Sequence, residues 1–439
     1  MAERKGWNYA EIKDMAAKER YSFVDGDWVE APFITSTGIR LIQTGNIGVG
    51  CFINKNKKFI SEESFNFLRC KDVFAGDILI CRLADPIGRS CIVPDLGGRA
   101  LTSVDVCILR VDTTRYDRDF ISHALNQDSF LAACQKKAGG STRQRISRTN
   151  LGEIRIIVAD KKEEQAKIAE ILSTVDRAIA QTQSLIAKQQ RIKTGLMQDL
   201  LTRGIDEQGN LRTEATHQFK DSPLGRIPVE WDVSPIGKYG SNERAFLKTG
   251  PFGSDLNTKH WTTEGVAVLT IGSLGTGNVL EEELLYISEP KAEKLKSFVV
   301  QNGDIIFSRV ADIGRSIVIS SCQDGWIISS NLMRISIDQQ KARSKFLHNN
   351  IAYNEAIRKQ LRATSNFGGR DVVNGAILSG LLFPWPSQEE QDLITNKIDA
   401  LNDSCQKTLN SIEKLKTLKA ALMQDLLTGK KRVTPLLNS

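Results

Sequence analysis

Lysine and arginine side chains gather beside a glycine pair at two places in this 439-residue sequence. Both groups contain residues that can neutralise phosphates, and an arginine fork can also bind guanine. A glycine loop lets the backbone approach a groove closely. The pattern is equally consistent with a polyanionic partner and with a pair of solvated helix ends, each with a flexible turn. The first group is Lys136, Lys137, Arg143, Arg145 and Arg148, around residues 139–142 (Gly-Gly-Ser-Thr), and the second is Arg358, Lys359, Arg362 and Arg370, around Gly368 and Gly369.

Motifs for catalysis are missing from the sequence. It has no Gly-x-x-x-x-Gly-Lys-Ser/Thr loop, no Asn-Pro-Pro-Tyr tract for amino-methyl transfer and no Gly-x-Ser-x-Gly elbow. The acidic pairs Asp77/Asp304 and Asp85/Asp312 suggest acid–base or magnesium chemistry, but their turn-like, glycine-containing contexts favour turn capping. We therefore expect no catalytic residue and no bound cofactor in this chain.

Metal-ligand spacing is also missing. The four histidines are scattered, and the eight cysteines include no C-x-x-C pair, so we expect buried thiols and no metal site. With 41% hydrophobic and 25% charged residues, the chain is expected to be globular with more than one core. Its net charge of +7 is compatible with a polyanion. The absence of a long apolar run or a signal-like start predicts a cytoplasmic protein that does not contact membrane.

An internal repeat organises the whole sequence. The tract Leu-Met-Gln-Asp-Leu-Leu-Thr occurs at 196–202 and again at 422–428, a shift of 226 residues (422 − 196). Upstream, Gly-Asp-Ile at 76–78 matches 303–305 at a shift of 227, and Ile-Gly-Arg-Ser at 87–90 matches 313–316 at 226, because Pro86 is one inserted residue. The chain therefore consists of two copies of one unit.

Each copy is expected to end in a long helix, over 163–203 and 388–428, of about 40 residues or roughly 60 Å. Their apolar residues step by fours and threes, which is typical of a coiled-coil seam. An intramolecular antiparallel pair is favoured over two unrelated surface helices. The seam consists of Ile168, Leu172, Val175, Ile179, Ile186 and Leu196 in the first helix, and Ile394, Ile398, Leu401, Ile412, Leu415 and Leu422 in the second.

The segments before the helices are expected to be strand-rich, because short β-branched runs such as 78–81, 92–94, 104–111, 266–271 and 317–319 are bounded by Gly, Asp and Asn. One helix is expected near the end of each segment, over 120–137 and 345–362. The fold class is therefore α+β, with two domains alternating with two long helices in a pseudo-two-fold repeat. The expected boundaries are 1–158, 159–205, 206–385, 386–430 and a tail at 431–439.

With this organisation, the sequence closely resembles the specificity subunits of type I restriction-modification systems. The resemblance rests on the helix ends at 193–205 (K-T-G-L-M-Q-D-L-L-T-R-G-I) and 419–429, the domain opening at 219–231 (F-K-D-S-P-L-G-R-I-P-V-E-W) and each helix-opening Glu-Glu-Gln. The first domain departs from the family by lacking the G-x-I-P-x-x-W opening seen at 225–231.

The resemblance implies two target-recognition domains that each read half of a split sequence in double-stranded DNA, and helices that act as a ruler. It also implies two methyltransferase subunits that dock on those helices and use S-adenosylmethionine, and restriction subunits that use ATP and Mg²⁺. This chain is then a non-catalytic recognition subunit. The alternatives are the specificity subunit of a related system whose partner fuses methyltransferase and nuclease, and a coiled-coil scaffold without DNA affinity.

Since the halves of a split target normally differ, residues that repeat should serve shared tasks such as folding or phosphate contact. Arg82 and Arg309, and Arg89 and Arg315, are such pairs. Base readout is expected where the halves diverge. The residues expected there are Thr142, Arg143, Gln144 and Arg145 in the first domain, and Ser365, Asn366, Arg370 and Asp371 in the second.

Overall fold

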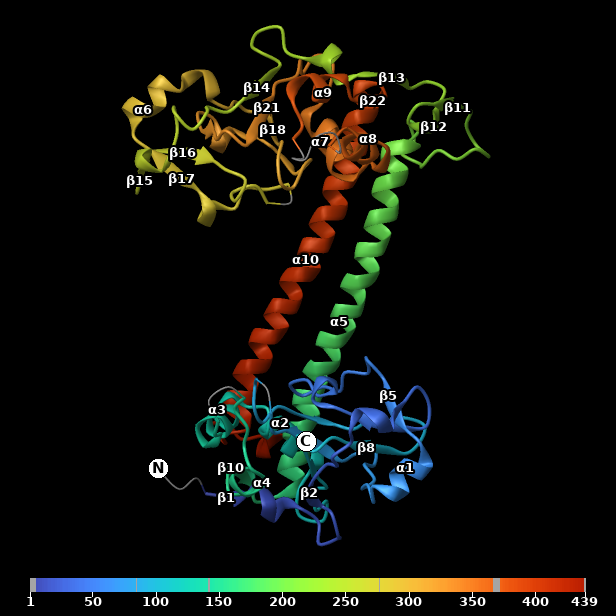
Figure 1. Cartoon of the computed structure of the whole chain (residues 1–439), viewed down its shortest axis with the longest axis vertical. Helices are drawn as coiled ribbons and strands as arrows, with labels where there is room; N and C mark the ends of the chain where they lie inside the picture. The colour runs from blue at the N-terminus through green and yellow to red at the C-terminus, as the bar shows by residue number, and fades with distance from the viewer. Residues whose placement is uncertain (1–4, 84, 141–142, 276, 366–371, 438–439) are drawn as a thin grey trace. The chain divides into compact units, whose positions relative to one another are not determined.

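The computed structural model describes residues 5–83, 85–140, 143–275, 277–365 and 372–437 (Figure 1). The chain divides into two compact units. Unit 1 is Met1–Ser184 together with Leu409–Ser439, and unit 2 is Leu185–Thr408. Each unit therefore contains a strand-rich segment, the start of one long helix and the end of the other.

Unit 1 is built on three small sheets. The first pairs β1 (Trp7–Glu11) with β10 (Arg155–Ala159). The second has the order β2-β9-β6-β7 and the third the order β3-β5-β4-β8, in which β4 and β8 are parallel. The other strands are β2 (Phe23–Asp25), β3 (Ile34–Thr35), β4 (Ile39–Ile42), β5 (Lys58–Ile60), β6 (Ile78–Cys81), β7 (Ser90–Ile92), β8 (Ala100–Thr102) and β9 (Val106–Leu109).

Unit 2 repeats this topology strand by strand. Its sheets pair β13 with β22, and run β14-β21-β18-β19 and β15-β17-β16-β20, again with one parallel pair, β16 and β20. A hairpin of β11 (Phe219–Ser222) and β12 (Gly225–Pro228) precedes them. The other strands are β13 (Asp232–Pro235), β14 (Leu247–Thr249), β15 (Trp261–Thr262), β16 (Val266–Leu269), β17 (Leu285–Ile287), β18 (Ile305–Ser308), β19 (Ser316–Val318), β20 (Ile327–Ile328), β21 (Leu332–Ile335) and β22 (Leu382–Trp385).

The apolar runs explain the central strands. All four residues of β6 and of β18 are buried, as expected for short β-branched strands covered on both faces. The strand expected over 92–94 begins earlier in the structure, because β7 starts at Ser90. The Asn126 side chain accepts a hydrogen bond from the backbone N–H of Ser90 and donates one to the Ser90 carbonyl.

The prediction of one helix near the end of each domain was wrong, because the structure has two in each place. These are α2 (Arg118–Ala124) and α3 (Asp128–Lys137) in unit 1, and α7 (Ser344–Tyr353) and α8 (Glu355–Ser365) in unit 2. At the second break, the Asn354 side chain accepts from the N–H of Ala356 at 3.0 Å and donates to the Leu201 carbonyl. An asparagine that caps the next helix ends the previous one. The remaining short helices are α1 (Glu62–Phe67), α4 (Arg148–Gly152), α6 (Glu289–Lys294) and α9 (Gly375–Gly380).

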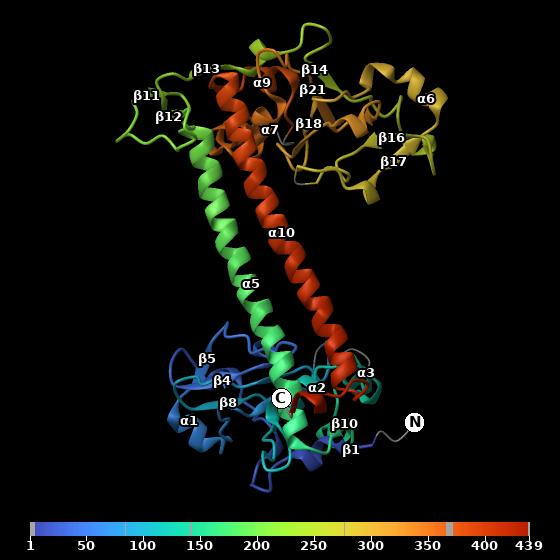
Figure 2. The same ribbon diagram turned by 180° about the vertical axis from the view of Figure 1, so that it is seen from behind.

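The two long helices are α5 (Lys162–Thr202) and α10 (Gln388–Leu426), close to the predicted bounds. In unit 1 the start of α5 packs against the end of α10, since Ile168 and Leu172 share a core with Leu426 and Leu427 (Figures 1 and 2). In unit 2 the roles reverse, and Ile394 and Ile398 share a core with Leu200 and Leu201. Of the predicted seam, Ile168, Leu172, Ile394, Ile398 and Ile412 are buried, and Val175, Ile179, Ile186, Leu196, Leu401, Leu415 and Leu422 are partly buried.

Matching polar contacts fix both helix starts. The side chain of Gln165 accepts from the Asp117 N–H at 2.8 Å, and Gln391 accepts from the Arg343 N–H at 2.9 Å. Each glutamine also donates to the carbonyl of a residue just before its helix, Ala159 or Pro386. These buried bonds explain why Glu-Glu-Gln opens both helices.

The preceding glutamates bind the tail that follows the other helix. Glu164 accepts two bonds of 2.7 Å from Arg432, while Glu390 accepts from Arg212 and, at 3.0 Å, from the Trp231 indole. Within the described residues, no helix is both long enough and apolar enough to cross a membrane.

Candidate nucleic-acid interface

The first basic group lies on a loop closed by backbone pairing. Gly139 donates to the Arg145 carbonyl at 3.0 Å, and Arg145 donates back to Gly139 at 2.9 Å. Gly140 has φ +105°, and a side chain there would collide with the carbonyl of Arg143. The loop therefore requires glycine and presents the exposed Arg143 at its tip. Thr142 lies outside the described residues.

Neighbouring members of this group are partly engaged. Arg145 pairs with Asp105 at 3.2 Å and donates to the Val104 carbonyl, and Lys137 pairs with Glu153 at 3.4 Å. Gln144 accepts from Gln135. Lys136, at the end of α3, and Arg148, at the start of α4, are exposed. Several cations around the loop are thus exposed and could bind a polyanion, while Arg145 fixes the end of the loop to the domain.

The second group lies on α8, where Arg358 and Lys359 are exposed and Arg362 pairs with Glu355. Arg358 and Arg362, with Arg315 and His348, line a cavity of about 690 Å³ between α7, α8 and the turn before β19. Ser365 is the last residue of α8. The predicted readout residues Asn366, Arg370 and Asp371 lie outside the described residues.

The repeated arginines hold their own domains together. Arg82 is buried, donates to the Val104 carbonyl at 2.8 Å and pairs with Asp25 at 3.1 Å. Arg89 donates to the Ile47 carbonyl, and Arg315 makes the corresponding bond to Leu274. Arg309 is partly buried. Three of these four guanidinium groups are thus committed to backbone carbonyls, which suits the folding task better than phosphate contact.

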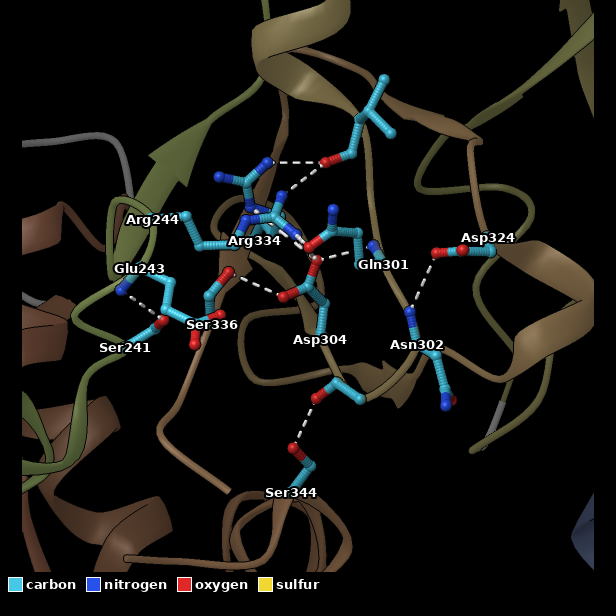
Figure 3. A network of polar contacts seen from close by, with 12 residues as sticks. Ser241, Glu243, Arg244, Gln301, Asn302, Asp304, Asp324, Arg334, Ser336 and Ser344 are labelled. Carbon is cyan, nitrogen blue, oxygen red and sulfur yellow. Dashed lines mark hydrogen bonds and ion pairs between the residues drawn. The ribbon is translucent and has the colours of Figure 1, made fainter. Parts of the chain in front are cut away.

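Two of the four aspartates expected to cap turns, Asp77 and Asp304, do so. Asp77 accepts from the Phe74 N–H at 2.9 Å, and Asp304 accepts from the Gln301 N–H at 2.8 Å. Figure 3 shows Asp304 within a network that also includes Arg244 at 3.2 Å and Ser336 at 2.6 Å. Burial lowers the pKa of the adjacent Arg334 to about 10.

Two histidines sit in the packing between domain and helix. Burial lowers the pKa of His348 to about 4, and its Nδ1 lies 3.1 Å from the Ser316 hydroxyl. Burial also lowers the pKa of His123, against an opposing effect of Asp176, which is itself paired with Lys419 at 2.6 Å. In the described part of the chain, no three His, Cys, Asp or Glu side chains form a group that could hold a metal ion.

Sequence reasoning missed a second basic loop in unit 1. Lys55 and Lys57, before β5, and Lys58, its first residue, are all exposed. Two side chains fix the backbone of this loop. Asn46 donates to the carbonyls of Ile53 and Lys55, and the buried Arg40 donates to the carbonyls of Lys55 and Lys58. The run Lys-Asn-Lys-Lys at 55–58 was the available signal, but it has no counterpart in the second copy.

Comparison with known proteins accounts for this duplicated architecture. Residues 4–189 match the family model described as type I restriction modification DNA specificity domain. The putative type I restriction enzyme MjaX specificity subunit of Methanocaldococcus jannaschii is 26% identical over 366 residues, which cover 82% of this chain and 79% of the relative. Both matches show that the chain is similar in sequence to type I restriction-modification specificity subunits.

Solved structures share the fold of this chain over nearly its whole length. The crystal structure of a type I restriction-modification S subunit from M. genitalium is 15% identical, covers 96% of both chains and gives a TM-score of 0.55. A structure described under complex assembly and conformational transition of the type I R-M system is 14% identical, covers 97% of this chain and 98% of that one, and gives 0.59. The mixed helix and strand fold is thereby confirmed.

Proposed function

We propose that this chain is a type I restriction-modification specificity subunit, in which each strand-rich segment reads one half of a bipartite target in double-stranded DNA. The single observation that carries the proposal is the duplicated topology, in which two four-stranded sheets recur in the same strand order in both units. Two similar domains with different surface loops suit a target whose halves differ. We retain 1–158 and 206–385 as the recognition domains, 159–205 and 386–430 as the helices, and 431–439 as a tail.

The helices α5 and α10 form an antiparallel coiled coil in this proposal, with a pseudo-two-fold axis relating the two copies. Support comes from the reversed roles of the helix ends, because each unit packs the start of one helix on the end of the other. Seam residues in the middle of both helices are less exposed than their neighbours. A rigid pair of this kind sets the length of the unread spacer.

DNA contact is assigned to the exposed cations. Lys136, Arg143 and Arg148 in unit 1, and Arg358 and Lys359 in unit 2, have solvent-accessible side chains that suit phosphates or base edges. Arg82, Arg89 and Arg315 are assigned to folding instead, because their guanidinium groups bind backbone carbonyls. Base readout by the remaining predicted residues stays a prediction.

Methyltransferase docking is assigned to the outer faces of the helices. Ile192 and Leu418 occupy matching positions in the repeat, 226 residues apart (418 − 192), and both are exposed. A repeated apolar residue on a helix surface fits two copies of one protein partner. The proposal assigns S-adenosylmethionine to those subunits, ATP and Mg²⁺ to restriction subunits, and no catalytic step to this chain, which works in the cytoplasm.

Co-expression with methyltransferase subunits in a methylation-free host tests the proposal. Mapping of modified adenines across the host genome should give one bipartite motif with a fixed spacer. A stable complex that introduces no methylation, or methylation without a split motif, would contradict it. Duplex binding by the same complex should also weaken steeply with salt, because phosphate contacts release counterions.

A further inference from the structure

Two large aromatic side chains, Trp28 and Phe252, are exposed at matching positions of the two units. Trp28 is 69% exposed and Phe252 is 71% exposed. An aromatic ring left in water loses the stabilisation that burial would give. A single exposed ring is common and needs no explanation, but an exposed ring at the same place in both copies does. Features that repeat serve tasks that both domains share.

The match rests on backbone register. In unit 1, β2 pairs Asp25 with Cys107, and in unit 2, β14 pairs Thr249 with Met333. The next residue in each is a glycine whose N–H bonds the partner strand, at 2.8 Å for Gly26 and 3.1 Å for Gly250.

Both glycines are required by the same close approach. A side chain on Gly26 would collide with the carbonyl of Ser103, and one on Gly250 with the carbonyl of Ser329. Ser103 and Ser329 are themselves 226 residues apart (329 − 103), which is the shift of the repeat. The aromatic residue follows two positions later in each unit, so the same backbone device presents both rings.

Around Trp28 the surface is hollow, and the loop that carries Lys55, Lys57 and Lys58 contributes Asn56 to its lining. Trp28, Asn56 and Asp105 line a hollow of about 380 Å³. Its carboxylates are compensated, Asp27 by Lys71 and Asp105 by Arg145. Among the described residues, no ion pair joins Lys55, Lys57 or Lys58 to an acid. Asn56, from the lysine loop at 55–58, and Asp105, the ion-pair partner of Arg145, thus line one hollow together with Trp28.

We propose that Trp28 and Phe252 are equivalent aromatic contacts with DNA bases, one in each half-site. The inference rests on the proposed bipartite reading and names residues that carry part of it. Thymine presents an apolar methyl group in the major groove of a duplex, so an exposed ring near a lysine-rich loop suits double-stranded DNA. A protein partner fits less well, because the lysines on either side of Asn56 suit a polyanion.

The two units differ in the charges beside the ring. The loop of unit 2 that corresponds to the lysine loop carries Glu281, Glu282 and Glu283. Phosphate contacts at this place therefore belong to unit 1 alone, and the aromatic ring is the feature that both units share. Base contacts specify whereas phosphate contacts position, so removal of either ring should alter sequence preference.

The test uses the complete complex of this chain with its methyltransferase subunits. Trp28→Ala should relax the motif at one or more positions of a single half-site and weaken binding of the mapped duplex by roughly 5- to 150-fold. Phe252→Ala should do the same to the other half-site. Phe67→Ala is the matched control, because Phe67 is 76% exposed in unit 1 but aligns with Lys294 in the second copy, and it should leave both half-sites unchanged.

A second variant keeps the test decisive if Trp28→Ala fails to fold. Trp28→Phe should retain the motif, and the fluorescence quenching of the wild-type complex by DNA should shrink in it, since contact with a base quenches indole. Equal quenching in both complexes, or an unchanged motif in Trp28→Ala, would overturn the inference while the bipartite reading stands. Loss of the methyltransferase subunits from Trp28→Ala would instead place the ring against protein and overturn it too. A wild-type complex without a bipartite motif would refute the proposed function itself.

Discussion

Individual arginines in this chain divide into those bound within a domain and those whose side chains are exposed. Arg82 is buried against Asp25 and a carbonyl, whereas Arg143 is exposed at the tip of a glycine-dependent loop. Residue type and spacing alone place both in a basic region. Only the burial of each guanidinium separates the two roles.

Arg143→Ala should relax specificity at one base of the first half-site, because a bidentate contact with guanine contributes about 1 to 3 kcal/mol of discrimination. Binding of duplexes that vary at each position of the mapped motif measures this. The matched control is Lys136→Ala, which should weaken all duplexes about equally and reduce the salt slope by about 1. If Arg143→Ala also weakens every sequence equally, Arg143 is a phosphate contact.

Arg82→Ala should lower stability and leave the motif unchanged. Removal of a buried guanidinium leaves Asp25 and two backbone carbonyls without their partner, which costs on the order of 3 kcal/mol. Chemical denaturation of the complete chain measures the loss, and methylation mapping of the surviving complex checks the motif. A stable variant with a relaxed motif would return Arg82 to the DNA contacts.

His348 should make unit 2 less stable in mild acid. Its pKa is about 4 in the folded chain and about 6.5 when unfolded, so the unfolded state binds the extra proton first. The stabilising contribution of the neutral ring is complete above about pH 6.5 and is lost as the pH falls toward 4. Denaturation midpoints between pH 7 and pH 4 should therefore fall less steeply for His348→Gln than for the wild type. Identical slopes would contradict this assignment.

At the scale of elements, the repeated Leu-Met-Gln-Asp-Leu-Leu-Thr tract is explained by docking. Leu201 and Leu427 end α5 and α10 in equivalent ways, and each is fully buried against the start of the other helix. The tract recurs because both units bury the same apolar residues at this place. This is the reason that the sequence match is strongest at the helix ends.

Leu427→Ala should destabilise unit 1 by about 2 to 5 kcal/mol, and Leu201→Ala should destabilise unit 2 by a similar amount, because each leaves a cavity in its core. Denaturation followed by hydrogen exchange assigns the loss to a unit. The control is Leu393→Ala, on an exposed face of α10, which should change little. Protection lost in the unit that does not contain the substituted leucine would refute the docking account.

Sequence periodicity predicted the long helices more accurately than the short ones. The long helices were found to within two residues, because 40 residues of regular apolar spacing leave little ambiguity. The short helices were merged, since the breaks at Asn126 and Asn354 depend on bonds to Ser90 and Leu201, which are far away in the sequence. Trp28 and Phe252 escaped notice because their local shift is 224 (252 − 28), and only strand register aligns them.

At the scale of the whole molecule, the chain consists of two units that share their internal contacts and differ in their surface residues. Equivalent glutamines fix the helix starts, equivalent glutamates bind the returning tails, and equivalent sheets carry the loops. The differences lie on the surface, where Lys55 aligns with Glu282, and Lys57 and Lys58 align with Leu284 and Leu285, at the shift of 227. Shared interiors with divergent surfaces are what a bipartite target requires.

The most direct test of this account is an insertion of four residues after Gln183 in α5, followed by methylation mapping of the complex. Four residues add about one helical turn, roughly 6 Å, to the proposed ruler. The account predicts the same two half-sites separated by a longer unread spacer. An active complex with an unaltered spacer, or with altered half-sites, would contradict it.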